Sequence, residues 1–170
     1  MKAEKKSARI LAQARKRRDE ELASQGDEER VQLVVFTLLD DYYACPGTEI
    51  REILHPTKIA SVPGTPDIIL GIINVKGDIE SVLSAHKLLG LQDQQPTPRS
   101  RIMIAESHGV RSGILVDSVT DVAEFPASSI HPPISTLDSS IKDLVTGEMS
   151  YEQRTVTLLS VAKILGKLVA

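Results

Sequence analysis

Three charged residues interrupt an apolar segment at positions that a β-strand would place on one face. The segment is residues 71–90, GIINVKGDIESVLSAHKLLG, in which Lys76, Asp78 and Glu80 stand at every second position. Because successive side chains of a strand point to opposite faces, this spacing predicts an outer or groove-facing charged surface. Ile79 and every second residue counted from it are then expected to point inward. The chemistry that such a face can perform is ion pairing, and the segment is expected to be a half-buried strand rather than a core strand.

The other reactive residue types form no catalytic or metal-binding pattern. None of the four histidines has a ligand neighbour at helical or strand spacing, and no glycine-rich phosphate loop or G-x-S-x-G elbow occurs. The single cysteine, Cys45, cannot form an intrachain disulfide and has no base beside it, so it is expected to be a small apolar filler. These observations predict no enzymatic activity, no metal and no cofactor, and they favour a binding module. The histidines are His55, His86, His108 and His131.

The composition narrows the class of partner. The 170 residues are 41% hydrophobic and only 3% aromatic, with no Trp and a formal net charge of −3. Scarce rings and a negative charge argue against a nucleic-acid surface. No stretch approaches the roughly 20 apolar residues of a membrane helix, and no apolar segment typical of a signal peptide follows the N-terminus. We therefore expect a cytoplasmic protein that neither binds nucleic acid nor inserts into a membrane.

Residues 1–30 differ in charge from the body, residues 31–170. They hold nine of the 20 Lys and Arg residues and are expected to form a charged helical extension, which Ser7 could cap and a linker at Gly26 would end. Its apolar stripe is thin. Two interpretations stay open: a solvated helix, or a helix that docks on an acidic partner or on lipid head groups. The stripe consists of Ala8, Leu11 and Ala12.

The body is expected to be mainly β, because runs of β-branched and apolar residues alternate with turn residues. A short helix is expected to open at Thr65-Pro66-Asp67, and a terminal helix is expected from about Val161. Strands are predicted over 31–38, 42–45, 72–75, 79–83, 101–106, 113–122 and 156–159.

A segment near the middle of the chain recurs near its end. IESVLSAHKLLG, residues 79–90, aligns without gaps on TVTLLSVAKILG, residues 155–166. Each copy reads as a strand end, a serine that can cap a short helix, and a glycine at the C-terminus of that helix. The spacing of 76 residues is about half the body. The body is therefore predicted to contain two related β lobes, and a groove between lobes favours partner or ligand binding.

Residues 31 to about 168 resemble the CheW-like domain of bacterial chemotaxis coupling proteins. The matching stretches are LVVFTLLDDYYAC, IREILHPTKIASVPGTPDIILGIINVKG, GVRSGILVDSVTDV and IHPP. Between Ile50 and Gly77 the family pattern V-x-E-I … P … G-x-x-N-L-R-G maps without gaps. The resemblance implies two pseudo-symmetric five-stranded β-barrels, SH3-like lobes with short helices, and no enzymatic activity.

The same resemblance implies protein partners and leaves two functions open. The expected partners are the histidine kinase CheA, through its regulatory domain, and the cytoplasmic tips of chemoreceptors, whose helices are expected in the inter-lobe groove of a protein located at membrane-associated arrays. One function is an adaptor that couples receptor to kinase. The other is a divergent stand-alone regulator that competes for the same kinase or receptor surface, for example in a twitching-motility or other non-flagellar pathway.

Five residues are expected to bind partners by this resemblance. Lys76 stands where the family has Arg and Glu52 where it has Glu, so the two are expected to form an ion pair near the binding surface. The alternative is a turn lysine and a solvated glutamate, and an exposed pair stabilises by only about 0–1 kcal/mol. Ile50, Val119 and Val122 are implied groove contacts, with ordinary core packing as the alternative for each.

The chain departs from the family pattern just after Gly77. Asp78, Glu80 and Ser81 stand where the family has apolar residues and Pro, and Ser84 replaces an Asp but keeps the capping ability. These departures change the surface that a kinase or receptor would touch.

Overall fold

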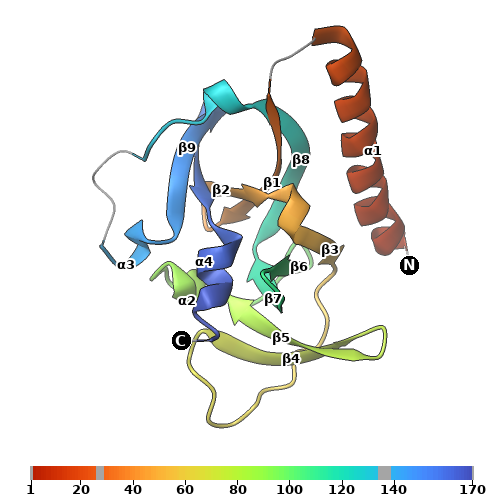
Figure 1. Cartoon of the computed structure of the whole chain (residues 1–170). Coiled ribbons are helices and arrows are strands. Elements are labelled where there is room, and N and C mark those ends of the chain that lie inside the picture. Colours follow the sequence, from red (N-terminus) through yellow and green to blue (C-terminus); the bar gives the residue numbers. More distant parts are fainter. Residues whose placement is uncertain (1, 26–28, 134–138, 170) are drawn as a thin grey trace.

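Ten strands form two five-stranded sheets in the computed structural model, which describes residues 2–25, 29–133 and 139–169 (Figure 1). The expected mainly-β fold with two five-stranded lobes is confirmed. In spatial order, the first sheet holds β8 (Ser118–Pro126), β1 (Arg30–Leu38), β2 (Asp41–Pro46), β10 (Arg154–Leu159) and β9 (Val145–Tyr151). The second holds β3 (Ile50–Leu54), β6 (Arg101–Ser107), β7 (Val110–Val116), β5 (Asp78–Ser84) and β4 (Ile69–Val75). The helices are α1 (Lys2–Gln25), α2 (Ala85–Leu88), α3 (Ser139–Lys142) and α4 (Val161–Gly166), with 3-10 turns η1 (Gly47–Glu49) and η2 (Ala127–Ser129).

Each sheet takes strands from both halves of the chain. The hairpin β1–β2 is joined to β8, β9 and β10, whereas the hairpin β6–β7 is joined to β3, β4 and β5. The strand orders become identical when β1–β5 are matched with β6–β10 in sequence. In each sheet one parallel pair, β2–β10 or β5–β7, connects the hairpin of one half to strands of the other. The two halves of the sequence are therefore interleaved and do not fold as separate lobes.

The repeated segments have matching local structure. Ser84 and Ser160 both cap a helix, because their side-chain oxygens accept hydrogen bonds from the backbone nitrogens of Lys87 and Lys163 at 3.2 and 3.1 Å. The predicted serine caps are thus confirmed. The backbone nitrogens of the two serines donate to the carbonyl oxygens of Ile68 and Leu144, each at 2.8 Å, and these partners are again 76 residues apart.

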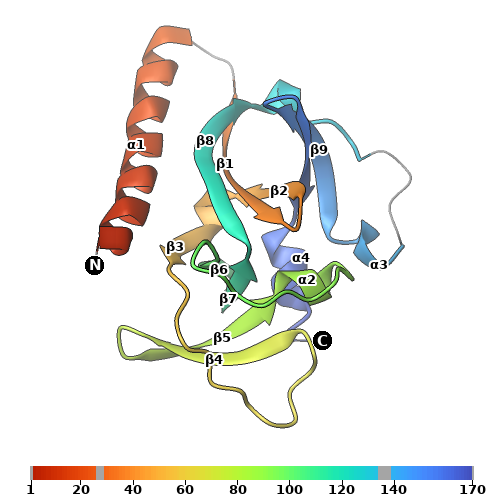
Figure 2. The same ribbon diagram turned by 180° about the vertical axis from the view of Figure 1, so that it is seen from behind.

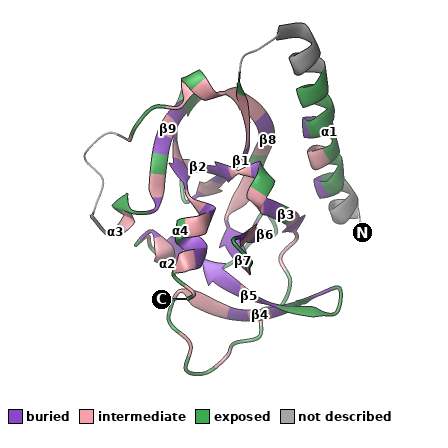
Figure 3. Ribbon diagram, viewed as in Figure 1, coloured by how far each residue is buried: buried purple, intermediate pink, exposed green. Residues whose placement is uncertain are grey.

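Three groups of apolar side chains stabilise the interleaved sheets. One lies within the first sheet, one within the second, and the largest joins both sheets to α1, α2 and α4 (Figure 3). The first-sheet core contains Leu33, Val35, Ala44, Met149, Val156 and Leu158. The second-sheet core contains Ile73, Val75, Val82, Ile102, Ile104 and Leu115. Each sheet therefore buries apolar residues on both faces.

The N-terminal extension is a helix that packs on its own chain. α1 lies along β8 and also contacts β3, as both views show (Figures 1 and 2). Ala14 is 0% exposed and belongs to the shared core, and Ile10 and Leu11 pack against that core. Ser7 lies inside the helix and is buried, so the expectation that it caps the helix is wrong. The linker predicted at Gly26 lies outside the described residues.

Other departures from the predicted elements have local causes. The helix expected at Thr65-Pro66-Asp67 is a turn, in which the backbone nitrogen of Ile69 donates to the Pro66 oxygen at 2.9 Å before β4 begins. The single strand expected over 113–122 is two strands, because the chain crosses from the second sheet to the first at Asp117. β9 was not predicted at all. None of the described helices is both long and apolar enough to cross a bilayer.

Candidate functional site

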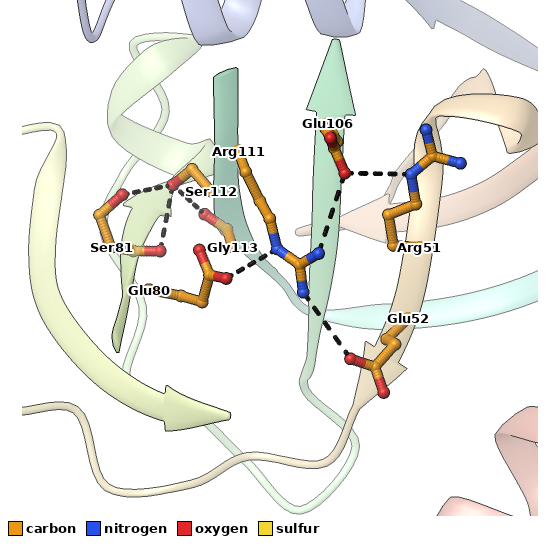
Figure 4. Close-up of polar contacts among 8 residues, drawn as sticks. All are labelled: Arg51, Glu52, Glu80, Ser81, Glu106, Arg111, Ser112 and Gly113. Carbon is orange, nitrogen blue, oxygen red and sulfur yellow. Dashed lines mark hydrogen bonds and ion pairs between the residues drawn. The ribbon is translucent and has the colours of Figure 1, made fainter. Parts of the chain in front are cut away.

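A row of paired charges crosses the second sheet from its edge strand β3 to β5 (Figure 4). The side chains come from neighbouring strands and from the turn between β4 and β5. Three are basic and three are acidic, so the row is neutral as a whole. Its members are Arg51 and Glu52 on β3, Glu106 on β6, Arg111 on β7, Glu80 on β5 and Lys76 in the turn.

The ion pair expected between Lys76 and Glu52 is present. Lys76 Nζ donates to Glu52 Oε1 at 2.9 Å, and the lysine side chain is 79% exposed. The pair connects the β4–β5 hairpin to β3, the opposite edge strand of the same sheet. Its role in partner binding stays a prediction.

Arg111 is the centre of the row. Its Nε lies 2.7 Å from Glu80 Oε1, its Nη1 3.8 Å from Glu106 Oε2 and its Nη2 4.0 Å from Glu52 Oε2. The Glu106 carboxylate also accepts a hydrogen bond from Arg51 Nε at 3.2 Å. Glu80 is the most buried member, with a side chain that is 11% exposed, so its pairing with Arg111 is the contact with least solvent screening.

The predicted faces of β5 are wrong at its N-terminal end. Ile79 is 61% exposed, whereas Glu80 is buried and points toward Arg111. Lys76 belongs to the turn, where its φ is 52°, so a two-residue count that starts at Lys76 passes through the turn and does not describe strand faces. Val82 and Leu83 belong to two different apolar cores, so this half of the strand is a core strand.

The first sheet has a related polar contact between its own edge strands. Tyr151 on β9 donates its hydroxyl hydrogen to Asp121 Oδ2 on β8 at 2.8 Å. Burial first, and then this hydrogen bond, raises the pKa of Tyr151. Asp121 and Glu52 both lie at a register shift of their edge strand, opposite Val35 and Ile104 respectively. In each sheet, therefore, a carboxylate on one edge strand bonds to a side chain at the opposite side of the sheet. The partner is Tyr151 in the first sheet and Lys76 in the second.

The structure separates the other three predicted contact residues. Val119 is partly buried and lines a hollow of about 1360 Å³ that Lys6 of α1 also borders. Ile50 and Val122 are buried in the shared core, and Val122 is 0% exposed. With α1 in place both side chains have a packing role, and their role in partner binding stays a prediction.

Sequence reasoning missed Arg111, Glu106 and Arg51. Glu106 and Arg111 are directly opposed in the β6–β7 hairpin, on either side of the His108-Gly109 turn. Opposite charges that flank a two-residue turn are a signal of a cross-strand pair, and this signal was available in the sequence. The proximity of both residues to Glu80 depends on the parallel pairing of β5 with β7, which no local pattern indicates.

One histidine, His86, is buried, and its contact with Asp117 holds neighbouring segments of the chain together. His86 Nε2 lies 3.0 Å from Asp117 Oδ1, and the other carboxylate oxygen accepts a hydrogen bond from the Leu39 backbone nitrogen at 2.6 Å. Among the residues that the structure describes, no three His, Cys, Asp or Glu side chains gather as a metal site would require.

Comparisons with known proteins agree on one family. The model of the CheW-like domain matches residues 32–169. The chemotaxis protein CheW of Helicobacter pylori is 29% identical over 141 residues, which cover 83% of this chain and 85% of that protein. The protein FrzA of Myxococcus xanthus is 25% identical and covers 86% of this chain and 92% of its own length. The crystal structure of the scaffolding protein TtCheW from Thermoanaerobacter tengcongensis has a TM-score of 0.69 and 29% identity, covering 77% of this chain and 89% of that one.

Proposed function

The chain belongs to the CheW-like domain family, and from this membership we propose that it is an adaptor that couples chemoreceptors to the histidine kinase CheA. Members of the family are scaffold proteins rather than enzymes, so coupling would proceed through protein surfaces. The observation that carries the proposal is the interleaved pair of five-stranded sheets, which spans the region matched by the family model. We place the protein in the cytoplasm, at membrane-associated receptor arrays.

The charged row on the second sheet supports this proposal because it gives a partner both signs of charge in a fixed order. Exposed charges of this kind set orientation and association rate more than affinity. Lys76 has the most exposed side chain of the row, and its ion pair with Glu52 keeps it beside the edge strand β3. We propose Glu52, Lys76 and the partly buried Val119 as contact residues, with apolar anchors of the partner supplying most of the binding energy.

The proposal is tested by titrating purified full-length protein with a CheA regulatory domain and with a receptor cytoplasmic-tip fragment. Lys76→Glu places a like charge beside Glu52 and is expected to weaken binding of at least one partner by about tenfold, which corresponds to 1.4 kcal/mol. Lys58→Glu is the matched control, because Lys58 is exposed and lies outside the charged row. No binding of either partner by the unmodified chain would contradict the adaptor function.

A second candidate function is a stand-alone regulator that occupies the kinase or receptor surface and blocks it. The observation that favours it is the position of α1, which covers β3 and β8 beside the candidate contact residues. A reconstituted receptor–kinase mixture distinguishes the two functions. Added adaptor is expected to raise receptor-controlled kinase activity, whereas an added competitor is expected to lower it.

A further inference from the structure

α1 lies in a trough between two edge strands. β3 is the edge of the second sheet and β8 is the edge of the first, and α1 contacts both. Two hollows border the helix, one along β3 and one that touches α1 at Lys6. The hollow of about 530 Å³ lies between α1 and β3 and is bordered by Glu52 and Lys76. The larger hollow of about 1360 Å³ lies near the start of β8 and is bordered by Val119. The proposed contact residues therefore line hollows that α1 also borders.

The face by which α1 attaches is a narrow seam. Ser7, Ile10, Leu11, Ala14 and Arg18 follow one another at spacings of three, one, three and four residues, which places them on one side of a helix. The seam is about 16 Å long, because a helix rises about 1.5 Å per residue. Ser7 and Ala14 let the helix approach closely, and among its described side chains only Ile10 and Leu11 are large apolar groups that pack against the core. The attachment is therefore modest compared with the hydrogen-bonded strands beneath it.

Two buried polar atoms of the trough are not satisfied by α1. The Glu124 side chain on β8 is 3% exposed, and its Oε1 makes no hydrogen bond to any described residue. Arg18 of α1 forms an ion pair with this oxygen, but its Nε lies 3.6 Å away, which is too long for a hydrogen bond. His55, which borders the hollow beside β3, has a buried Nε2 that also lacks a hydrogen-bond partner among the described residues. A buried carboxylate oxygen that lacks a hydrogen bond is costly even beside a cation, so the trough would favour a ligand that places a basic group closer to Glu124 Oε1 than Arg18 does.

The opposite net charges of α1 and the body favour attachment of the helix, but they do not determine where on the body it binds. Residues 2–25 contain eight basic and four acidic residues, whereas the body carries an acidic excess. A positive segment attached to a negative body has a high local concentration near it, so a weak contact is well occupied. A partner helix must overcome that local concentration, which makes α1 a competitor built into the chain.

We propose that α1 is a displaceable intramolecular occupant of the trough between β3 and β8, so that a partner helix has to exchange with it. The exchanging partner is an α-helix with small and apolar residues at the seam spacing and one Lys or Arg directed at Glu124. In the setting of the proposed adaptor function, on which this partner assignment rests, α1 lowers the affinity of the protein for a helical partner until it is displaced.

The experiment uses the full chain and two substitutions that detach α1 in different ways. Arg18→Glu places two carboxylates together at Glu124, and Ala14→Arg puts a long charged side chain at a fully buried position. Arg17→Glu and Ala12→Arg are matched controls with the same charge changes at exposed neighbouring positions. Thermal unfolding of all four variants verifies that the sheets remain folded.

The first probe is a fluorescein-labelled peptide of residues 2–25, followed by anisotropy. Both detaching variants are expected to bind the peptide about tenfold more tightly than the unmodified chain, whose trough is occupied, and the controls are expected to match the unmodified chain. Hydrogen exchange in β3 and β8 is expected to rise in the same two variants. Equal peptide affinity in all five proteins would overturn the proposal.

The second probe is the receptor cytoplasmic-tip fragment. About fivefold tighter binding by the detaching variants alone supports α1 as the competitor for that partner. Equal binding by all five proteins would overturn the exchange while leaving the adaptor function intact. If none of them binds the fragment but the peptide result holds, the adaptor function fails and the helix-binding trough stands.

Discussion

Glu80 occupies a position that its structural counterpart fills with an apolar residue. The 76-residue repeat relates Glu80 to Val156, which is 0% exposed in the core of the first sheet. Val156 lies opposite Tyr42 across the parallel strand pair, and the residue in the place of Tyr42 in the second sheet is Arg111. The Val156–Tyr42 contact of the first sheet therefore corresponds to the Glu80–Arg111 ion pair of the second, and the rest of the charged row continues from that ion pair.

Arg111→Tyr alone is expected to destabilise the fold by about 2 kcal/mol, because it leaves the Glu80 carboxylate largely buried without its cation. Adding Glu80→Val should restore the free energy of unfolding to within about 1 kcal/mol of the unmodified chain, since apolar replacement of a buried pair is often neutral. Urea denaturation measures both. A double variant no more stable than the single variant would contradict the assigned pairing.

Cys45 is expected to resist labelling in the folded chain. Burial first, and then the negative charge of Glu49, raises the pKa of Cys45 to about 12. Because the thiolate is the reactive form, iodoacetamide at pH 8 should react on the order of 10³-fold more slowly than with an exposed cysteine. The rate should stay low between about pH 7 and 9, since the thiol of the folded state ionises only near its raised pKa. Rapid labelling in concentrated urea is the control, and rapid labelling without urea would contradict the burial.

At the scale of elements, the two capping serines offer a matched comparison. Ser84→Ala and Ser160→Ala are each expected to lower the free energy of unfolding by about 1 kcal/mol, because each removes the acceptor for a first-turn backbone nitrogen. Ser160→Asp should keep the cap because Ser160 is partly exposed, whereas Ser84→Asp should destabilise because Ser84 is buried. Thermal melts of the four variants check the order, and a stable Ser84→Asp would contradict it.

The elements that the sequence predicted are those with local signals. The turn at Lys76-Gly77 and the serine caps depend on residues within a few positions of one another, and all are present. The separation of β7 from β8 depends on Asp117, whose backbone nitrogen donates to the Thr37 oxygen at 3.0 Å across a long sequence distance. β9 contains Gly147 and Glu148 and lacks the apolar run that marked the other strands. Its place is set by pairing with β10, which no pattern within its own residues indicates.

At the scale of the whole molecule, the repeat was visible but the exchange of strands was not. Twelve aligned residues show that β5–α2 resembles β10–α4. These residues do not indicate whether β5 or β10 pairs with the β1–β2 hairpin or with the β6–β7 hairpin, because both hairpins offer an apolar strand at the same position. The same limit applies to the candidate site: the Glu52–Lys76 pair followed from the family resemblance, whereas its link to Glu80 through Arg111 required the three-dimensional pairing.

Interleaving predicts that the two sheets unfold together, because neither can form without strands from both halves of the chain. The aromatic residues provide a one-sided probe, since all three tyrosines and both phenylalanines lie in strands of the first sheet. Val82→Ala removes buried methyl groups from the core of the second sheet and should cost about 2 kcal/mol. The near-ultraviolet circular dichroism of the tyrosines and the far-ultraviolet signal of the whole chain should then shift to the same lower urea midpoint. A tyrosine transition that stays at the unmodified midpoint would show that the sheets are independent and would contradict the interleaved fold as the source of cooperativity.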